Sequence, residues 1–241
     1  MIKIKNSAEF ERLLKALSND IVDAHIHYRL YKDIDNALSK HPLVAQQSNI
    51  FWTYTLQAHL NSSLYALFRA YDQNKSALHL RSLLLTIKAN LYLFDETGFR
   101  ERLKDNPYVA SLAQDSKKPD ARMLNDDIDA CSQSDPLVKN LIRYRGNHLA
   151  HKNANSLITS QEINDNNELM FEDFNLLLER AKTILNKYSY LFSASFYSTT
   201  IVGCDDYKLI FKCVEGNVKL TMQQWSHLSL GAEGTKKPDQ N

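Results

Sequence analysis

YRGNHLAHKN, at residues 144–153, is the stretch in which chemically active side chains concentrate. The surrounding segment, residues 136–161, contains no aspartate or glutamate, yet it carries four basic side chains and two histidines: Lys139, Arg143, Arg145, Lys152, His148 and His151. The whole chain has a formal net charge of only +1, so the positive charge here is a local feature. Such a field can hold a phosphate, and imidazoles can move protons near neutral pH.

The stretch lies near the end of a predicted helix that begins at Ser134-Asp135-Pro136. Aspartate before the first turn and proline within it are typical helix-start signals. Apolar residues then recur at helical spacing and form the expected buried stripe: Leu137, Val138, Leu141, Ile142 and Leu149. We therefore expect the motif to lie on a core helix of residues 136–152.

Working outward, three further segments keep long apolar stripes of helical period and complete a predicted bundle: residues 43–71, 77–94 and 171–197. In the first of these, the expected buried side is Phe51, Leu56, Leu60, Leu64, Leu67 and Phe68. Shorter helices are predicted at residues 7–17, 20–38 and 119–131, with another in 97–118 followed by a loop. Residues 205–215 fit a helix or a strand, and we predict a helix.

The composition favours an ordinary globular all-α protein. Hydrophobic residues make up 44% of the 241 positions, and only 6 glycines and 5 prolines occur, too few for a turn-rich β-sandwich. We expect one helical domain over residues 1–200, a helical extension packed on it over 201–228 and a disordered tail over 229–241.

The composition also restricts where the protein works. The three cysteines, Cys131, Cys204 and Cys213, are too scattered for a disulfide framework and fit a reducing cytoplasm. No stretch approaches the roughly 18 apolar residues of a membrane span, so no membrane association is expected. The near-zero net charge means that nucleic acid would have to bind at a local patch rather than by bulk attraction.

The residues of the motif are suited to cleaving a phosphodiester without metal. A base must remove the ribose 2′-hydroxyl proton and an acid must protonate the departing oxygen, each step contributing roughly 10²- to 10⁴-fold. Neutral His151 or His148 could act as the base and a protonated partner as the acid, and Arg145 or Arg143 could hold the phosphate with its planar fork. No carboxylate or cysteine lies nearby in the sequence to complete a metal shell with the histidines, so no metal or other cofactor is predicted.

The sequence RGNHLAH resembles the arginine-(four to six residues)-histidine signature of HEPN domains, closing on its characteristic Leu-Ala-His. About one such spacing is expected by chance in a chain of this composition, so the context carries the argument. The preceding LYALFRAYDQNKSALHLRSLLLTI, residues 64–87, is similar to the abortive-infection U branch of that family. The resemblance covers roughly residues 10–195, and it matches Arg145 and His151 to the family arginine and histidine.

The resemblance implies an all-α bundle that dimerises through its motif helices and forms a composite ribonuclease site. Helix geometry agrees, because six residues leave Arg145 and His151 about 120° apart around one helix, so a twofold partner would have to complete the site. Many family members place asparagine directly after the arginine, whereas here Gly146 stands there and Asn147 follows. By the same analogy, we expect a nucleotidyltransferase-type or other antitoxin as a partner.

Two functions remain open at this point. The first is a metal-independent endoribonuclease, a toxin or phage-defence effector that leaves 2′,3′-cyclic phosphate ends on RNA. Its catalytic residues would be Arg145 and His151, supported by Lys139, Arg143, Asn147, His148 and Lys152. The second is a non-catalytic module that binds RNA, a nucleotide or a protein partner. In either case, simple helix-end complementarity is a competing explanation for part of the basic cluster.

Overall fold

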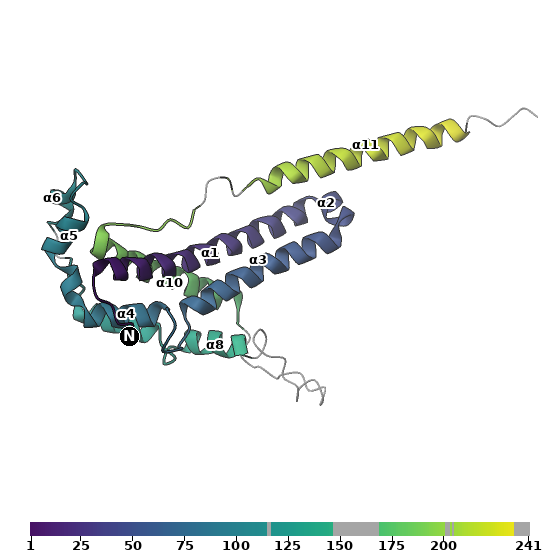
Figure 1. Cartoon of the computed structure of the whole chain (residues 1–241). Helices are drawn as coiled ribbons and strands as arrows, with labels where there is room; N and C mark the ends of the chain where they lie inside the picture. Colours follow the sequence, from purple (N-terminus) through teal and green to yellow (C-terminus); the bar gives the residue numbers. More distant parts are fainter. Residues whose placement is uncertain (115–116, 147–168, 201–202, 204, 234–241) are drawn as a thin grey trace, which may run out of the picture. The chain divides into compact units, whose positions relative to one another are not determined.

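The computed structural model describes residues 1–114, 117–146, 169–200, 203 and 205–233, with side chains described as far as residue 225. The elements in chain order are α1 Ser7–Lys40, α2 Pro42–Gln47, α3 Asn49–Ala70, α4 Leu80–Ala89, the 3₁₀ helix η1 Leu91–Phe94, α5 Glu96–Arg102, α6 Val109–Leu112, α7 Ala121–Ala130, α8 Pro136–Tyr144, α10 Phe171–Ser193 and α11 Tyr207–Glu233 (Figure 1). The described part of the chain contains no strand, which confirms the all-α prediction.

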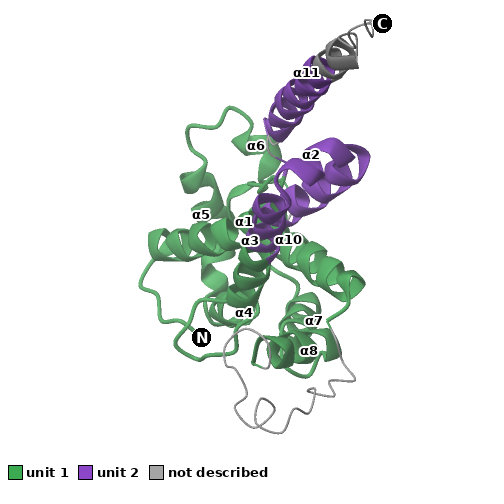
Figure 2. Ribbon diagram, turned by 90° about the vertical axis from the view of Figure 1, so that its right-hand side faces the viewer, with its two compact units in different colours: residues 1–26, 61–199 green, residues 27–60, 200–241 purple. Residues whose placement is uncertain are grey.

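The chain forms two compact units (Figure 2). The first unit comprises residues 1–26 and 61–199, and the second unit comprises residues 27–60 and 200–241. These units group residues 27–60 with the C-terminal segment. The division of the chain into domains at residues 200 and 228 therefore stays a prediction.

An aromatic cluster fixes the core of the first unit. The ring of Phe10 on α1 lies edge-on to Phe94 of η1, at 5.7 Å between centroids, and to Phe192 of α10, at 4.8 Å. Edge-to-face contacts at these separations are the preferred arrangement of aromatic rings. The Tyr71 hydroxyl, also buried, donates to the Leu177 carbonyl at 2.9 Å and joins the end of α3 to α10. The first unit is therefore packed around one face of α10.

A smaller core holds the second unit together. Ile34, Val44, Trp52 and Phe211 are buried against one another and come from α1, α2, α3 and α11. Phe211 lies edge-on to Trp52 at 5.0 Å between ring centroids. Because these side chains come from four helices, the unit depends on the C-terminal helix as much as on the N-terminal ones.

Helix α1 is continuous, so the predicted break near Ser18-Asn19 is wrong. The Ser18 hydroxyl donates a hydrogen bond to the Lys15 carbonyl at 2.8 Å, and Ser18 lies inside the helix. Leu17 and Ile21 are both buried, so the apolar stripe runs through the expected turn. Burial of that stripe outweighs the weak local preference of serine and asparagine for turns.

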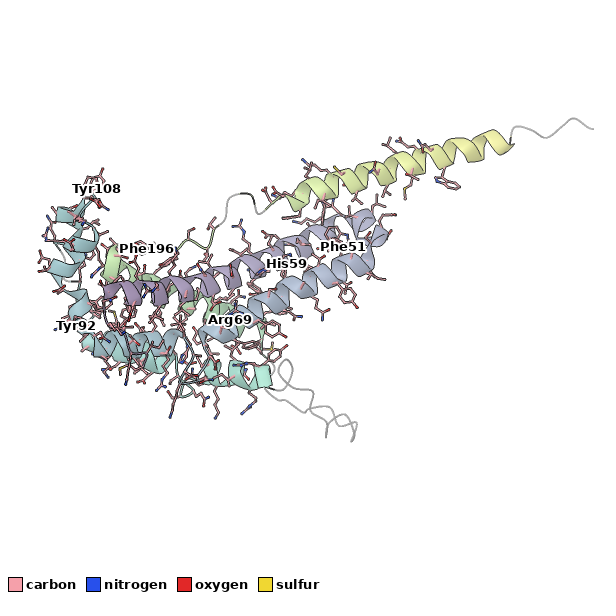
Figure 3. All side chains as sticks on the ribbon, in the orientation of Figure 1. Phe51, His59, Arg69, Tyr92, Tyr108 and Phe196 are labelled. Carbon is pink, nitrogen blue, oxygen red and sulfur yellow. The ribbon has the colours of Figure 1, made fainter. Side chains whose placement is uncertain are left out.

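The segment predicted at residues 43–71 is two helices, separated at Ser48, which ends α2. Phe51 was expected on the buried side but is 60% exposed on α3, and its neighbour Trp52 is buried instead (Figure 3). A single-residue shift at the new helix start rotates the stripe by about 100°. The helix expected at 77–94 begins later, at Leu80, and ends in the separate 3₁₀ turn.

The C-terminal half confirms two predicted helices and changes their ends. Residues 205–215 lie mostly in α11, so the helix is correct, and it continues to Glu233, beyond the expected end at Leu228. Helix α10 ends at Ser193 rather than near Tyr197, because Ala194 adopts a left-handed conformation with φ 50°. Among the described residues, no helix is long and apolar enough to cross a membrane.

Adjacent leucines on α10 provide a test of this packing. Leu177 is fully buried, whereas Leu176 is 57% exposed. Leu177→Ala should lower the free energy of unfolding by about 2–5 kcal/mol, because it leaves a cavity in the first unit. Leu176→Ala is the matched control and should change it by about 0.5 kcal/mol or less. Urea unfolding followed by circular dichroism measures both, and equal effects would contradict the assigned face of α10.

Candidate functional site

The beginning of the motif helix α8 is fixed by Asp135. One carboxylate oxygen of Asp135 accepts the backbone N–H groups of Leu137 at 3.0 Å and Val138 at 3.1 Å. The other oxygen pairs with Arg180 of α10 at 3.0 Å, and the same guanidinium nitrogen donates to the Ala130 carbonyl at 2.8 Å. Asp135 therefore caps the first N–H groups of α8 and also pairs with Arg180. Because Arg180 lies on α10 and donates to the end of α7, these contacts join α8 to both helices.

A second polar network lies beside this cap. Asp127 of α7 accepts from the Lys187 ammonium and the Tyr188 hydroxyl of α10, each at 2.7 Å. Asp127 belongs to the acidic stretch of residues 125–129, yet its side chain is only 14% exposed. Burial raises the pKa of the neighbouring Cys131 thiol to about 12, so this cysteine is a packed, protonated side chain.

Helix α8 presents a buried face and a basic face. Val138 and Leu141 are buried, as the apolar stripe predicts, while Lys139 and Arg143 are exposed. Lys139 and Arg143 line a pocket of about 310 Å³ together with Pro136, Leu137, Asn140 and Asp173. The structure thus brings together two of the predicted supporting residues, with the Asp173 carboxylate of α10 beside them.

Arg145 stands just past the end of α8 and meets an acid that the sequence did not reveal. Its guanidinium Nη1 lies 3.5 Å from the Asp72 carboxylate oxygen Oδ1, with side chains 42% and 26% exposed. The same oxygen accepts the backbone N–H of Gln73 at 2.7 Å and of Asn74 at 3.1 Å, so Asp72 is held in place by its own loop. A half-exposed pair of this kind contributes at most about 1 kcal/mol, and it orients Arg145 more than it stabilises the fold.

The loop that carries Asp72 is itself anchored to the motif region. The Gln73 side-chain amide donates to the Tyr71 carbonyl at 2.9 Å and to the Cys131 carbonyl at 3.0 Å. Residues 72–76 lie between the predicted helices 43–71 and 77–94, and the chain there is not helical. The only sequence signal for the pairing was an aspartate inside the 64–87 stretch, more than seventy residues away from the arginine that it contacts.

Four predicted site residues lie outside the described residues: Asn147, His148, His151 and Lys152. Gly146, which follows Arg145, is exposed, and a side chain added there would meet no described atom within 4 Å. No cluster of three or more histidine, cysteine, aspartate or glutamate side chains suited to a metal occurs where the chain is described. Of the predicted site residues, the structure therefore describes three basic ones: Lys139, Arg143 and Arg145.

The cap of α8 should contribute more to stability than an ordinary helix cap. Asp135→Ala removes two N–H acceptors and leaves Arg180 without its carboxylate, so we expect a loss of about 2–3 kcal/mol in the free energy of unfolding. Asp120→Ala is the matched control, because Asp120 caps α7 through Met123 at 2.8 Å and is not in an ion pair with Arg180. It should lose about 1 kcal/mol. Urea unfolding that ranks Asp120→Ala as the more damaging change would contradict the proposed double function of Asp135.

The chain is similar to a known protein family over most of its length. The family model HEPN_AbiU2, described as AbiU2, matches residues 7–208. No curated protein and no solved structure matches the chain. The matched region includes the α3–α4 stretch, the cap of α8 and the complete RGNHLAH motif. The match covers most of the chain and confirms the resemblance to the abortive-infection U branch, so the chain belongs to the AbiU2 family of HEPN proteins.

Proposed function

We propose that this protein is a metal-independent endoribonuclease that acts in the cytoplasm as an abortive-infection or toxin effector. Membership of the AbiU2 family supports the abortive-infection setting. The observation that carries the enzymatic part is Arg145, which Asp72 orients at the end of a helix whose exposed face carries Lys139 and Arg143. An oriented guanidinium beside further cations is what a phosphodiester needs as its charge increases in the transition state.

In the proposed reaction, His151 takes the proton from the ribose 2′-hydroxyl and the 2′-oxygen attacks phosphorus. The bond from phosphorus to the 5′-oxygen breaks, and that oxygen receives a proton from a second imidazole. The products are a 2′,3′-cyclic phosphate and a 5′-hydroxyl, so no water, metal or cofactor is consumed. Arg145 stabilises the charge that gathers on the non-bridging oxygens.

The remaining motif residues have supporting functions in this proposal. Lys139, Arg143 and Lys152 hold the RNA backbone by charge, which makes binding dependent on salt. His148 and Asn147 contact the nucleotide beside the cleaved bond. The second imidazole comes from a twofold-related copy, as the composite site implied by the family resemblance requires. A nucleotidyltransferase-type or other antitoxin would restrain such an activity in the cell.

The first prediction from this proposal concerns cleavage itself. Purified protein incubated with total RNA in EDTA should produce fragments with 2′,3′-cyclic phosphate ends, detected by end-specific ligation and mass spectrometry. His151→Ala should lower the cleavage rate by roughly 10² or more, because the lost group acts in proton transfer. Circular dichroism should show the same helical content in both proteins.

Lys152→Ala is the companion variant for binding. It should weaken RNA binding and flatten its salt dependence, with a smaller effect on the rate of bound RNA. Cleavage by His151→Ala at the wild-type rate would remove His151 from the mechanism and leave His148 with Arg143 as the pair. Binding of RNA without cleavage, in EDTA and with divalent metals alike, would establish the non-catalytic binding module instead.

The second prediction tests the contact between Asp72 and Arg145. Asp72→Asn keeps an oxygen for the Gln73 and Asn74 N–H groups but removes the charge that attracts Arg145. We expect single-turnover cleavage to fall by about tenfold, because a mobile guanidinium is aligned less often. The control is Asp20→Asn, which breaks the comparable pair with Arg69 at 2.7 Å and should leave cleavage unchanged. A rate for Asp72→Asn at or above wild type would show that the ion pair does not position Arg145.

The third prediction concerns assembly. The proposed composite site requires a homodimer through the segment from Leu141 to His151, so light scattering should give twice the monomer mass at micromolar concentration. Mixing wild-type and His151→Ala proteins tests the sharing of the site, because a mixed dimer holds only one of the two imidazoles that the proposed reaction uses. Cleavage should then fall faster than in proportion to the fraction of wild-type protein. A monomer that nevertheless cleaves RNA would contradict the composite site while leaving the endoribonuclease proposal in place.

A further inference from the structure

The second unit contains a pocket of about 370 Å³ that the motif chemistry does not use. All its lining residues belong to this unit and come from the end of α1, the residue before α2 and the first two turns of α11: Asp33, Asn36, Ala37, Lys40, His41, Tyr207, Lys208, Phe211 and Lys212. Ligand sites in proteins have volumes of roughly 300–1,000 Å³, so this pocket is suited to a small ligand.

Aromatic side chains form the inner part of the pocket. Phe211 is buried, and its ring centroid lies 5.6 Å from that of His41 and 5.7 Å from that of Tyr207, both edge-on. On its other side, Phe211 packs against Trp52 in the core of the unit. His41 and Tyr207 are half-buried, so each offers part of a ring to the cavity. A flat aromatic ligand can pack against such surfaces.

Positive charge at the pocket is not fully neutralised by the protein. Lys208 pairs with Asp205 at 3.0 Å, Asp33 pairs with Arg29 at 3.4 Å, and His41 meets the Glu215 carboxylate at 3.1 Å. The two further lysines of the lining, Lys40 and Lys212, are exposed and make no ion pair with any described residue. These two ammonium groups come from different helices and are available to an anionic ligand.

The combination suits a planar ring that carries a phosphate. The ring explains the aromatic inner wall, and a phosphate explains two unpaired lysines at the rim. The Asn36 side-chain amide and the Asp33 carboxylate add a donor and acceptors that can recognise an exocyclic amino group. We propose that this pocket binds a nucleoside phosphate with an amino-bearing base, either as a free nucleotide or as one unit of single-stranded RNA.

In this arrangement the base packs against Tyr207 and His41, and the phosphate oxygens accept from Lys40 and Lys212. Lys208 contributes less, because Asp205 already engages its ammonium group. The site uses neither Arg145 nor His151. It therefore stands or fails independently of the proposed ribonuclease activity.

Isothermal titration calorimetry with adenosine 5′-monophosphate tests the proposal on the full chain. We expect saturable binding below millimolar concentration, with adenosine, inorganic phosphate and uridine 5′-monophosphate each weaker by about tenfold, since each lacks one recognised group. The double variant Lys40→Gln with Lys212→Gln should lower the affinity by at least about tenfold. Lys32→Gln is the matched control, because Lys32 lies on α1 outside the pocket lining, and it should bind like wild type.

A single-stranded oligoadenylate distinguishes the two sources of the ligand, titrated into His151→Ala protein to prevent cleavage. Tighter binding of the strand than of the mononucleotide, with competition between them, identifies RNA as the source. Preference for the mononucleotide identifies a free nucleotide. The double variant Lys40→Gln with Lys212→Gln must lower the affinity for whichever of the two ligands binds. Absence of binding by both ligands at millimolar concentration, or equal binding by the double variant and wild type, would overturn the proposal. Failure of RNA cleavage alone would leave it intact.

Discussion

The double contact of the Asp135 carboxylate is the interaction on which the candidate site depends. One oxygen accepts hydrogen bonds from the backbone N–H groups in the first turn of α8, and the other forms an ion pair with Arg180 of α10. Because α10 carries many buried side chains of the first unit, this contact fixes the motif helix to the core of that unit. A helix held at its beginning by a cap and along its length by Val138 and Leu141 can present Arg145 at its far end in one direction.

Arg145 illustrates how sequence context and spatial context differ. The segment around it is free of acidic residues along the chain, yet Asp72 approaches it from the α3–α4 loop. The backbone N–H groups of Gln73 and Asn74 donate to the Asp72 carboxylate, so these hydrogen bonds hold the carboxylate in one orientation. The ion pair leaves the guanidinium partly exposed, so in the proposed mechanism it is oriented and can still reach a phosphate.

The second unit adds a different kind of chemistry. Its core needs Phe211 from α11, and the same side chain forms the inner wall of the pocket that carries Lys40 and Lys212. Packing and ligand binding are therefore linked, because the residue that joins α11 to the unit also shapes the cavity. The charges around the pocket are mostly paired within the protein, which makes the two unpaired lysines specific candidates for an anion.

The sequence by itself determined the helical class, the family, the basic motif and the position of α8, since apolar periodicity, a capping aspartate and RGNHLAH are local signals. The sequence did not predict helix ends and buried faces correctly where the burial of side chains outweighs local preferences. Burial of Leu17 and Ile21 carried α1 through an expected turn, and a new helix start turned Phe51 outward. Only the tertiary structure brought Asp72 to Arg145 and Phe211 to the second core, because contacts between residues far apart in the chain leave no periodic trace in a single sequence.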